Sequence, residues 1–191
     1  MSMIGNFRSL SDDDLRALLE NPARVEQLQY GENALTGTNG EVVSLFDHPA
    51  QPPSEPETWE QEPDADELDV DKAWHGIHFL LTGTAWEGAF PLNFIVSGGK
   101  EIGDVDVGYG PARALTSDDV RRLDAALEPL TSDELERRFD PKQMTKLQIY
   151  PEIWADEDDD SLDYLIEYYT DLRDFVRRAA ERGHALLAYL N

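Results

Sequence analysis

The sequence predicts an α+β fold: a single compact domain of mixed helices around a small sheet, with a long C-terminal helix followed by a terminal strand. Three observations lead to this prediction. Helical and extended segments follow one another without the regular repeat of a parallel sheet. Apolar residues recur at helical spacing over about 161–182, and Gly183 separates them from the apolar run 184–190. The length of 191 residues suits one domain, 1–191.

The other elements follow from capping residues, turn residues and apolar spacing. A Ser or Thr stands three residues before an acid at 11, 116 and 131, which is the arrangement that caps a helix. Pro22 and Pro141 suit the first turn of a helix. We therefore expect helices at about 12–20, 22–30, 67–81, 117–128, 132–139 and from 141, strands at 1–7, 41–46 and 90–96, and a mostly extended stretch at 101–113.

One segment, at about 47–66, is rich in proline and acid and contains no base. Its prolines stand at 49, 52, 53, 56 and 63. Proline lacks a backbone donor, and the few apolar groups here cannot offset the entropic cost of ordering the chain. The segment is expected to be a solvated loop within the single domain.

Charge is the strongest compositional feature. The chain has 40 acids and 16 bases, a net charge of -24. Such a field repels phosphate backbones, so nucleic-acid binding is not expected. Adaptation to salt, solubility, and a functional acidic surface for a basic partner all remain open as explanations.

Composition also bears on the compartment. The mean hydropathy is -0.53 and no apolar run reaches the ~20 residues that a bilayer helix needs, so no membrane segment is expected. The chain has no cysteine, which removes disulfides, thiolate nucleophiles and thiolate metal ligands. The start of the chain has no signal-peptide pattern. We expect a cytoplasmic protein.

The segment "DKAWHGIHFLLTG", 71–83, contains two of the four histidines. On a helix Asp71, Trp74, His75 and His78 would share one side, so a divalent metal site is conceivable. The histidines are three apart, however, whereas helical zinc motifs place them four apart with a glutamate between. A core helix with aromatic packing is the favoured interpretation, and no metal site is assigned.

Two further motifs have simpler explanations than a binding site. Residues 156–167 place acids at positions 1, 3, 5 and 12 of a calcium loop, but Ser161 replaces the usual glycine, and acids also favour the start of the next helix. Residues 103–113 carry three glycines but no Walker pattern, which favours a turn. Tyr109 and Arg113 could still line a pocket there.

The chain also resembles a known family. The stretches "MSMIGNF", "DKAWHGIHFLLTG", "GYGPAR", "QIYPEIW" and "AAERGHALLAYL", in this order, closely resemble the YfbM-like bacterial proteins, also called domain of unknown function 1877. The resemblance implies a single compact α+β domain in the cytoplasm, with no established activity or catalytic residues. The segment at about 47–66 looks longer than in compact members of the family.

Two functional hypotheses follow. The first is a non-enzymatic binding protein whose acidic surface meets a basic protein partner, for example a toxin that it neutralises. The alternative is a small-molecule-binding protein or enzyme. Its pocket would be lined by Trp74, His75, His78, Tyr109 and Arg113. Neither hypothesis requires a cofactor, and no catalytic residue or oligomeric state is assigned.

Overall fold

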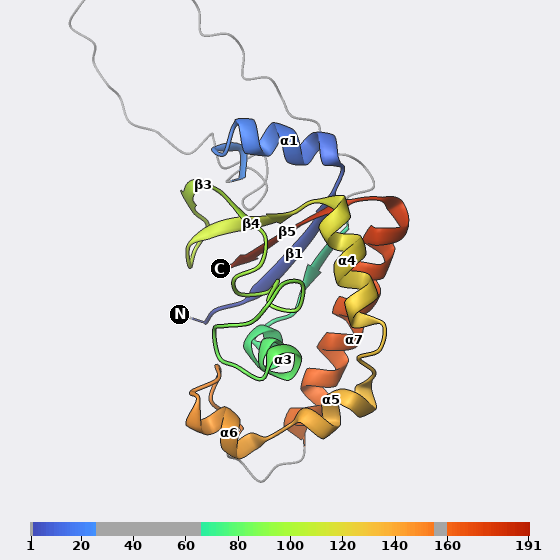
Figure 1. Ribbon diagram of the computed structural model, residues 1–191. Helices are drawn as coiled ribbons and strands as arrows, with labels where there is room; N and C mark the ends of the chain where they lie inside the picture. The colour runs from blue at the N-terminus through green and yellow to red at the C-terminus, as the bar shows by residue number, and fades with distance from the viewer. Residues whose placement is uncertain (1, 26–65, 155–159) are drawn as a thin grey trace, which may run out of the picture.

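A five-stranded antiparallel sheet forms the centre of the computed structural model, which describes residues 2–25, 66–154 and 160–191. The strand order is β2-β1-β5-β4-β3 (Figure 1). The strands are β1 (Gly5–Leu10), β2 (Glu67–Asp69), β3 (Lys100–Asp106), β4 (Pro111–Leu115) and β5 (Ala185–Leu190).

The terminal strand β5 lies in the middle of the sheet. It pairs with β1 along its whole length, from Gly5 opposite Leu190 to Leu10 opposite Ala185, and with β4 on its other side. A strand covered on both faces needs apolar residues at successive positions, and "ALLAYL" supplies them. The predicted terminal strand is confirmed, and the two ends of the chain lie side by side.

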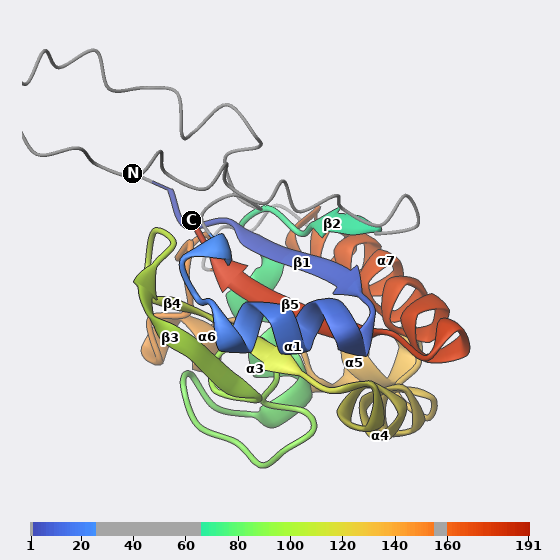
Figure 2. The same cartoon turned by 90° about the horizontal axis from the view of Figure 1, so that it is seen from above.

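Helices cover both faces of the sheet. Helix α1 (Asp12–Glu20) lies across one face, as seen from above in Figure 2. The other face carries α3 (Ala73–Thr82), α4 (Ser117–Leu127) and α7 (Asp160–Arg182), with α5 (Ser132–Arg138) and α6 (Pro141–Lys146) farther out. Successive residues of β5 point to opposite faces of the sheet. Leu187 packs toward α1, and Leu186 packs toward the larger helical layer.

The larger core is rich in aromatic side chains. Its biggest fully buried members are Trp74, Trp154, Tyr169, Phe94 and Phe175. The polar atoms of the rings are satisfied: the Tyr169 hydroxyl donates to the Leu130 carbonyl (2.6 Å) and the Trp154 indole donates to the Ile149 carbonyl (2.6 Å). Buried aromatic rings contribute large apolar area, and such partners remove the cost of burying their polar atoms.

Glycine is required where α3 approaches β1. A β-carbon added at Gly5 would lie 2.6 Å from the β-carbon of Trp74 and 2.9 Å from a methyl group of Val70. Neither atom is the end of a long flexible side chain. The close approach of strand and helix therefore depends on the absence of a side chain at Gly5.

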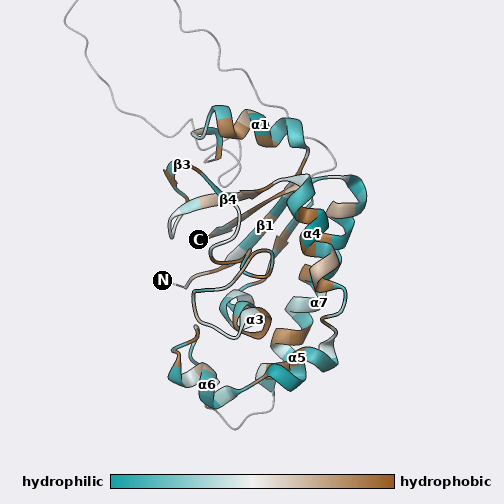
Figure 3. Cartoon of the chain, in the orientation of Figure 1, coloured by the Kyte–Doolittle hydropathy of each residue, from teal (hydrophilic) through white to brown (hydrophobic). Residues whose placement is uncertain are grey.

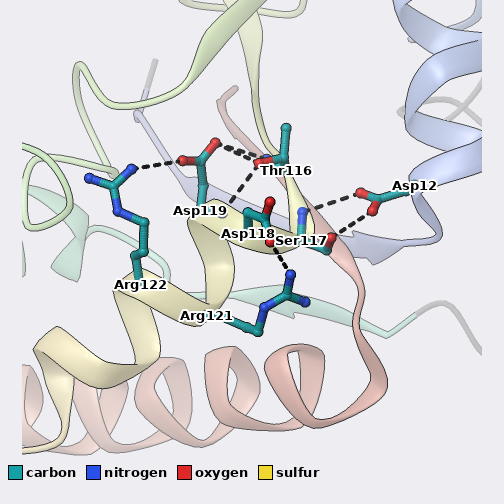
Figure 4. Close-up of polar contacts among 7 residues, drawn as sticks. All are labelled: Asp12, Thr116, Ser117, Asp118, Asp119, Arg121 and Arg122. Carbon is teal, nitrogen blue, oxygen red and sulfur yellow. Dashed lines mark hydrogen bonds and ion pairs between the residues drawn. The ribbon is translucent and has the colours of Figure 1, made fainter.

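The three predicted capping residues are confirmed. The Ser11 and Thr131 side chains accept from the third backbone N–H of α1 and α5, and Thr116 forms a full capping box with Asp119 on α4. One acid also caps another helix. Asp12, in the first turn of α1, accepts hydrogen bonds from the Ser117 backbone N–H (3.2 Å) and hydroxyl (2.6 Å), tying α1 to α4 (Figure 4).

The long helix was predicted closely. Helix α7 begins at Asp160, and Gly183 follows it with the left-handed φ of 69° that suits glycine at a helix end. Its apolar residues face the core and its polar residues face outward, and Figure 3 shows both kinds along the helix. Because the chain is already helical at Asp160, positions 5–12 of the twelve-residue calcium loop at 156–167 are part of α7. Residues 155–159 lie outside the described residues.

The helix predicted at 67–81 is wrong over residues 67–72. Residues 67–69 form β2, paired with β1, and the helix begins only at Ala73. The Asp69 carboxylate accepts from the Asp71 backbone N–H (2.6 Å), and Asp71 has a φ of 46°. A side chain that bonds its own backbone two residues on makes a turn, which stops a helix from extending backwards.

The strands predicted at 90–96 and 1–7 need correction too. Residues 90–97 form turns, in which the Asn93 carbonyl accepts from the backbone N–H groups of Ser97 and Gly98. Pro91 has no N–H for a sheet ladder, and apolar content alone did not distinguish a buried turn from a strand. The opening strand lies at Gly5–Leu10. The predictions for 41–46 and for most of 22–30 and 47–66 fall outside the described residues.

Candidate functional site

Helix α3 carries the Trp-His segment into the protein interior. Trp74, His75 and His78 are all fully buried. The helix lies beside α7 on the same side of the sheet (Figure 1), and is apolar on nearly every side, which is typical of a buried helix. The core helix predicted from the sequence is confirmed from Ala73 onward.

His75 has both ring nitrogens engaged. Its Nδ1 atom accepts a hydrogen bond from the Tyr150 backbone N–H (2.9 Å), so its Nε2 atom carries the proton and donates to the Ala85 carbonyl (2.7 Å). Burial lowers the pKa of His75, and the bond to Ala85 opposes this only in part. His75 is therefore a neutral side chain that joins α3 to two separate loops.

The rings around His75 form a stack. Trp74 lies parallel to His75 with centroids 4.7 Å apart, and its indole N–H donates to the Met3 carbonyl (3.1 Å). Trp86 is tilted against both rings, with its centroid 4.4 Å from His75 and 6.2 Å from Trp74, and Tyr150 lies 5.9 Å from Trp74. Trp86 is 55% exposed, so this aromatic cluster runs from the core to the surface.

His78 differs from His75. Neither of its ring nitrogens makes a hydrogen bond of good geometry within the residues that the structure describes, although the Glu87 backbone is close enough to act on its pKa. Burial, and then the nearby His75, lower its pKa to about 4, while the Glu87 backbone opposes the shift. A group with so low a pKa is almost wholly neutral at pH 7, and it is too weakly basic to serve as an efficient general base there.

The predicted pocket residues fall into two groups. The structure brings Trp74, His75 and His78 together. Tyr109 lies in the turn between β3 and β4, is 44% exposed, and donates its backbone N–H to the Leu190 carbonyl (3.1 Å). Arg113 on β4 forms an ion pair with Glu101 on β3 (2.6 Å). A pocket shared by all five residues stays a prediction.

The described residues contain no group of three or more His, Cys, Asp or Glu arranged to hold a metal ion. Asp71, the acid considered with the two histidines, instead accepts a hydrogen bond from the Tyr164 hydroxyl (3.1 Å). Among the described helices, none is both long enough and apolar enough to cross a bilayer.

Sequence reasoning missed a surface where α7 meets β2. We call it the acidic–tyrosine face, and it consists of Asp69, Asp71, Asp163, Tyr164, Glu167, Tyr168 and Asp171. The rings of Tyr164 and Tyr168 meet edge to face at 5.0 Å. The spacing of 163, 167 and 171 puts three exposed acids on one side of the helix, a periodicity that could have been read from the sequence.

The negative charge of these acids raises the pKa values of the two tyrosines. Partial burial raises the pKa of Tyr168, and the carboxylates of Asp71, Asp69, Glu167 and Asp171 raise it further. Burial and then the hydrogen bond to Asp71 raise the pKa of Tyr164 as well. Both phenols therefore stay protonated at neutral pH, so the Tyr164 hydroxyl donates to Asp71 and the Tyr168 hydroxyl is a further donor within a negative surface.

A groove lies between α1 and the start of α4. This shallow groove has a volume of about 360 Å³ and is lined by Asp12, Leu15, Arg16, Leu19, Thr116, Ser117 and Asp118. Its polar groups are largely used within the protein, because Asp12 caps Ser117 and Asp118 pairs with Arg121 (Figure 4). The groove is therefore simply the place where α1 and α4 meet.

Comparison with known proteins places this chain in a family. The model of a domain of unknown function, DUF1877, matches residues 1–189. The chain belongs to the DUF1877 family. A solved structure of similar fold is that of YfbM from Escherichia coli, itself a protein of unknown function. It has 22% sequence identity and a TM-score of 0.64, and the match covers 98% of this chain and 99% of that one. At this identity the likeness shows the fold alone, and no curated protein matches the chain.

Proposed function

We propose that this DUF1877 protein is a non-enzymatic interaction protein that binds a basic segment of a partner protein on the acidic–tyrosine face. The observation that carries the proposal is the row of Asp163, Glu167 and Asp171. These acids stand four apart on α7, are exposed, and form no ion pair within the described residues. Like charges at this spacing destabilise a helix by ~0.2–0.5 kcal/mol per pair, so the row works against folding.

Several acids on the other helices are arranged differently. Asp13, Asp118, Asp119 and Glu134 each have an arginine one turn away, in the pairs Asp13–Arg16, Asp118–Arg121, Asp119–Arg122 and Glu134–Arg137. Simple solubility would be served equally well by acids paired in this way. The unpaired row therefore supports a surface whose counter-charges come from another molecule.

The tyrosines favour arginine and lysine side chains as the groups bound. A guanidinium or ammonium group stacks on an aromatic face and pairs with carboxylates beside it, and Tyr168 lies among four such carboxylates. A toxin that the protein neutralises would be one such partner. Because the chain lacks cysteine, we expect the interaction to take place in the cytoplasm.

Titration calorimetry with a ten-arginine peptide tests the proposal. We expect binding at about 50 mM salt that weakens strongly at about 300 mM, because exposed charges are screened. The variant Asp163→Asn/Glu167→Gln/Asp171→Asn should lose at least about tenfold in affinity. The same variant should gain stability against urea, because two like-charged pairs are removed.

The matched control makes the same change of charge elsewhere. The variant Glu128→Gln/Asp133→Asn/Glu136→Gln removes three exposed acids on and next to α4 and α5. If both triple variants weaken binding equally, net charge alone attracts the peptide, and the acidic–tyrosine face is not a binding site. Binding that does not depend on salt would also contradict the proposal.

A further inference from the structure

The strand β2 has a free outer edge, because within the described residues it pairs with β1 alone and ends the sheet (Figure 2). Successive residues of an antiparallel strand direct their backbone N–H and C=O groups to alternate sides. At the end of the β1–β2 ladder, the Ser9 N–H donates to the Asp66 carbonyl (2.9 Å). Asp66 and Leu68 therefore direct their backbone groups to β1, and Glu67 and Asp69 direct theirs outward.

The pairing of β1 with β5 shows the same alternation independently. Ile4, just before β1, exchanges both backbone hydrogen bonds with Asn191 (2.8 and 3.1 Å). Even-numbered residues along β1 therefore bond to β5, and odd-numbered residues bond to β2. The outward N–H and C=O groups of Glu67 and Asp69 are thus two donors and two acceptors without a backbone partner in the described residues. Such an edge is a template on which another strand can pair.

Helix α7 runs along this edge. Near its start, the Tyr164 hydroxyl donates to the carboxylate of Asp71, just after β2 (3.1 Å). At its end, Arg182 lies 3.2 Å from the carboxylate of Asp66, just before β2. The spacing of 164, 168 and 171 puts these residues on the same side of the helix, turned to the strand. A segment added outside β2 would therefore lie against the acidic–tyrosine face.

The charges and their spacing select the kind of segment. The two arginines of α7 near β2, Arg178 and Arg182, both bond to Asp66, and the rest of this border carries the acids of the acidic–tyrosine face. The row at 163, 167 and 171 rises about 6 Å per step along the helix. Side chains on one face of an extended strand repeat about every 6.7 Å. Basic residues at every second position of an extended segment would therefore match the row.

We propose that the basic segment of the partner binds as an extended strand added to the outer edge of β2, with every second basic side chain turned to α7. This inference rests on the proposed function, which assigns a basic partner to the acidic–tyrosine face. Main-chain bonds to Glu67 and Asp69 hold the segment, and the carboxylates select arginine or lysine at alternate positions. A helical segment would use its backbone groups internally and leave those of β2 unpaired.

Three ten-arginine peptides of equal charge test this mode of binding to the full-length protein. One is unmodified, one is N-methylated at every second residue, and one at every residue. In titration calorimetry at about 50 mM salt, we expect the second, which keeps N–H groups along one edge, to bind within about threefold of the first. The third, which has no backbone donor, should bind at least about tenfold more weakly.

The peptides separate this inference from the proposed function. Equal binding by all three would refute strand addition and leave the proposed function standing. Equal weakening by both methylated peptides would also refute strand addition, because a free N–H edge would then make no difference. No binding of the unmodified peptide would overturn both the strand addition and the proposed function.

A proline in β2 makes the same test from the protein side. Asp69→Pro removes an N–H that points away from β1, a position where edge strands accept proline. Asp69→Ala is the matched control, because both variants lose the carboxylate and its bond to the Asp71 N–H (2.6 Å). Asp69→Pro should bind the unmodified peptide at least about tenfold more weakly than Asp69→Ala. Equal affinities of the two variants would refute the added strand.

Hydrogen exchange gives a direct measurement that does not depend on the folding of Asp69→Pro. In the wild-type protein, the outward amide protons of Glu67 and Asp69 should exchange at least about tenfold more slowly when the unmodified peptide is bound. Unchanged exchange at both amides with the peptide bound would contradict strand addition.

Discussion

Replacing His78 should remove a large part of the acid sensitivity of this protein. In the unfolded chain a histidine has a pKa of 6.5, whereas burial lowers the folded-state pKa of His78 to about 4. Between these values the unfolded chain binds a proton at this side chain and the folded chain does not. The free energy of unfolding therefore falls as pH falls through this window, and the contribution is fully present above pH 6.5.

The size of the effect follows from the shift. Each pKa unit corresponds to about 1.36 kcal/mol, so moving from about pH 7.5 to about pH 4.5 should cost about 2.5 kcal/mol through His78 alone. That is a sizeable share of the stability of a typical domain, about 5–15 kcal/mol. His75, whose pKa burial also lowers, should add to the loss in the same direction.

Urea unfolding at several pH values measures this effect in the wild-type protein, His78→Phe and His78→Gln. The acids titrate over the same range, and their protonation relieves repulsion in a chain with a net charge of -24. The quantity to follow is thus the difference between wild type and variant, in which the acids cancel. A difference that stays constant from about pH 7.5 to about pH 4.5 would refute the assignment of a buried neutral imidazole.

Three further substitutions test the packing and capping described above. Gly5→Ala should lower the free energy of unfolding by about 2–3 kcal/mol in urea titrations, because its β-carbon would overlap a tryptophan on α3. Asp12→Ala should cost about 1–2 kcal/mol in the same assay, because Ser117 loses its cap. Tyr164→Phe should cost about 1 kcal/mol through the lost bond to Asp71, and should remove from the absorbance titration a phenol that ionises at unusually high pH.

Asp13→Ala is the control for Asp12→Ala. It removes an exposed ion pair with Arg16 and should change stability by less than about 0.5 kcal/mol. If Asp12→Ala costs no more stability than Asp13→Ala, α1 and α4 are not coupled through Ser117. A Gly5→Ala protein as stable as wild type would show that β1 and α3 can separate freely. Unchanged phenol titration in Tyr164→Phe would place the shifted group elsewhere.

The fold was predictable where the signal is local. The caps at Ser11, Thr116 and Thr131 and the stop at Gly183 marked helix ends closely, because these residues act on backbone groups within one turn. Where an element depends on a pairing partner that is distant in sequence, the local pattern did not predict it. Residues 67–69 became a strand because the edge of β1 needed a partner.

The candidate site divides in the same way. The segment with Trp74, His75 and His78 could be singled out from the sequence, but its contacts could not. The Tyr150 backbone N–H donates to His75 although the two residues are 75 positions apart in sequence, and no pattern within α3 indicates this partner. Tyr109 and Arg113 looked suitable by residue type, yet their described contacts are with β5 and β3.

By itself the sequence determined the fold class, the family resemblance, the helix ends, the acidic charge and the absence of cysteine chemistry. These depend on composition and on interactions between near neighbours. The tertiary structure alone decided which imidazole is satisfied and which is not, because burial and hydrogen bonding depend on segments far apart in the chain. It placed Tyr164 and Tyr168 beside the acids of β2 and α7, and it buried His78 without a hydrogen bond of good geometry to its ring nitrogens in the described chain.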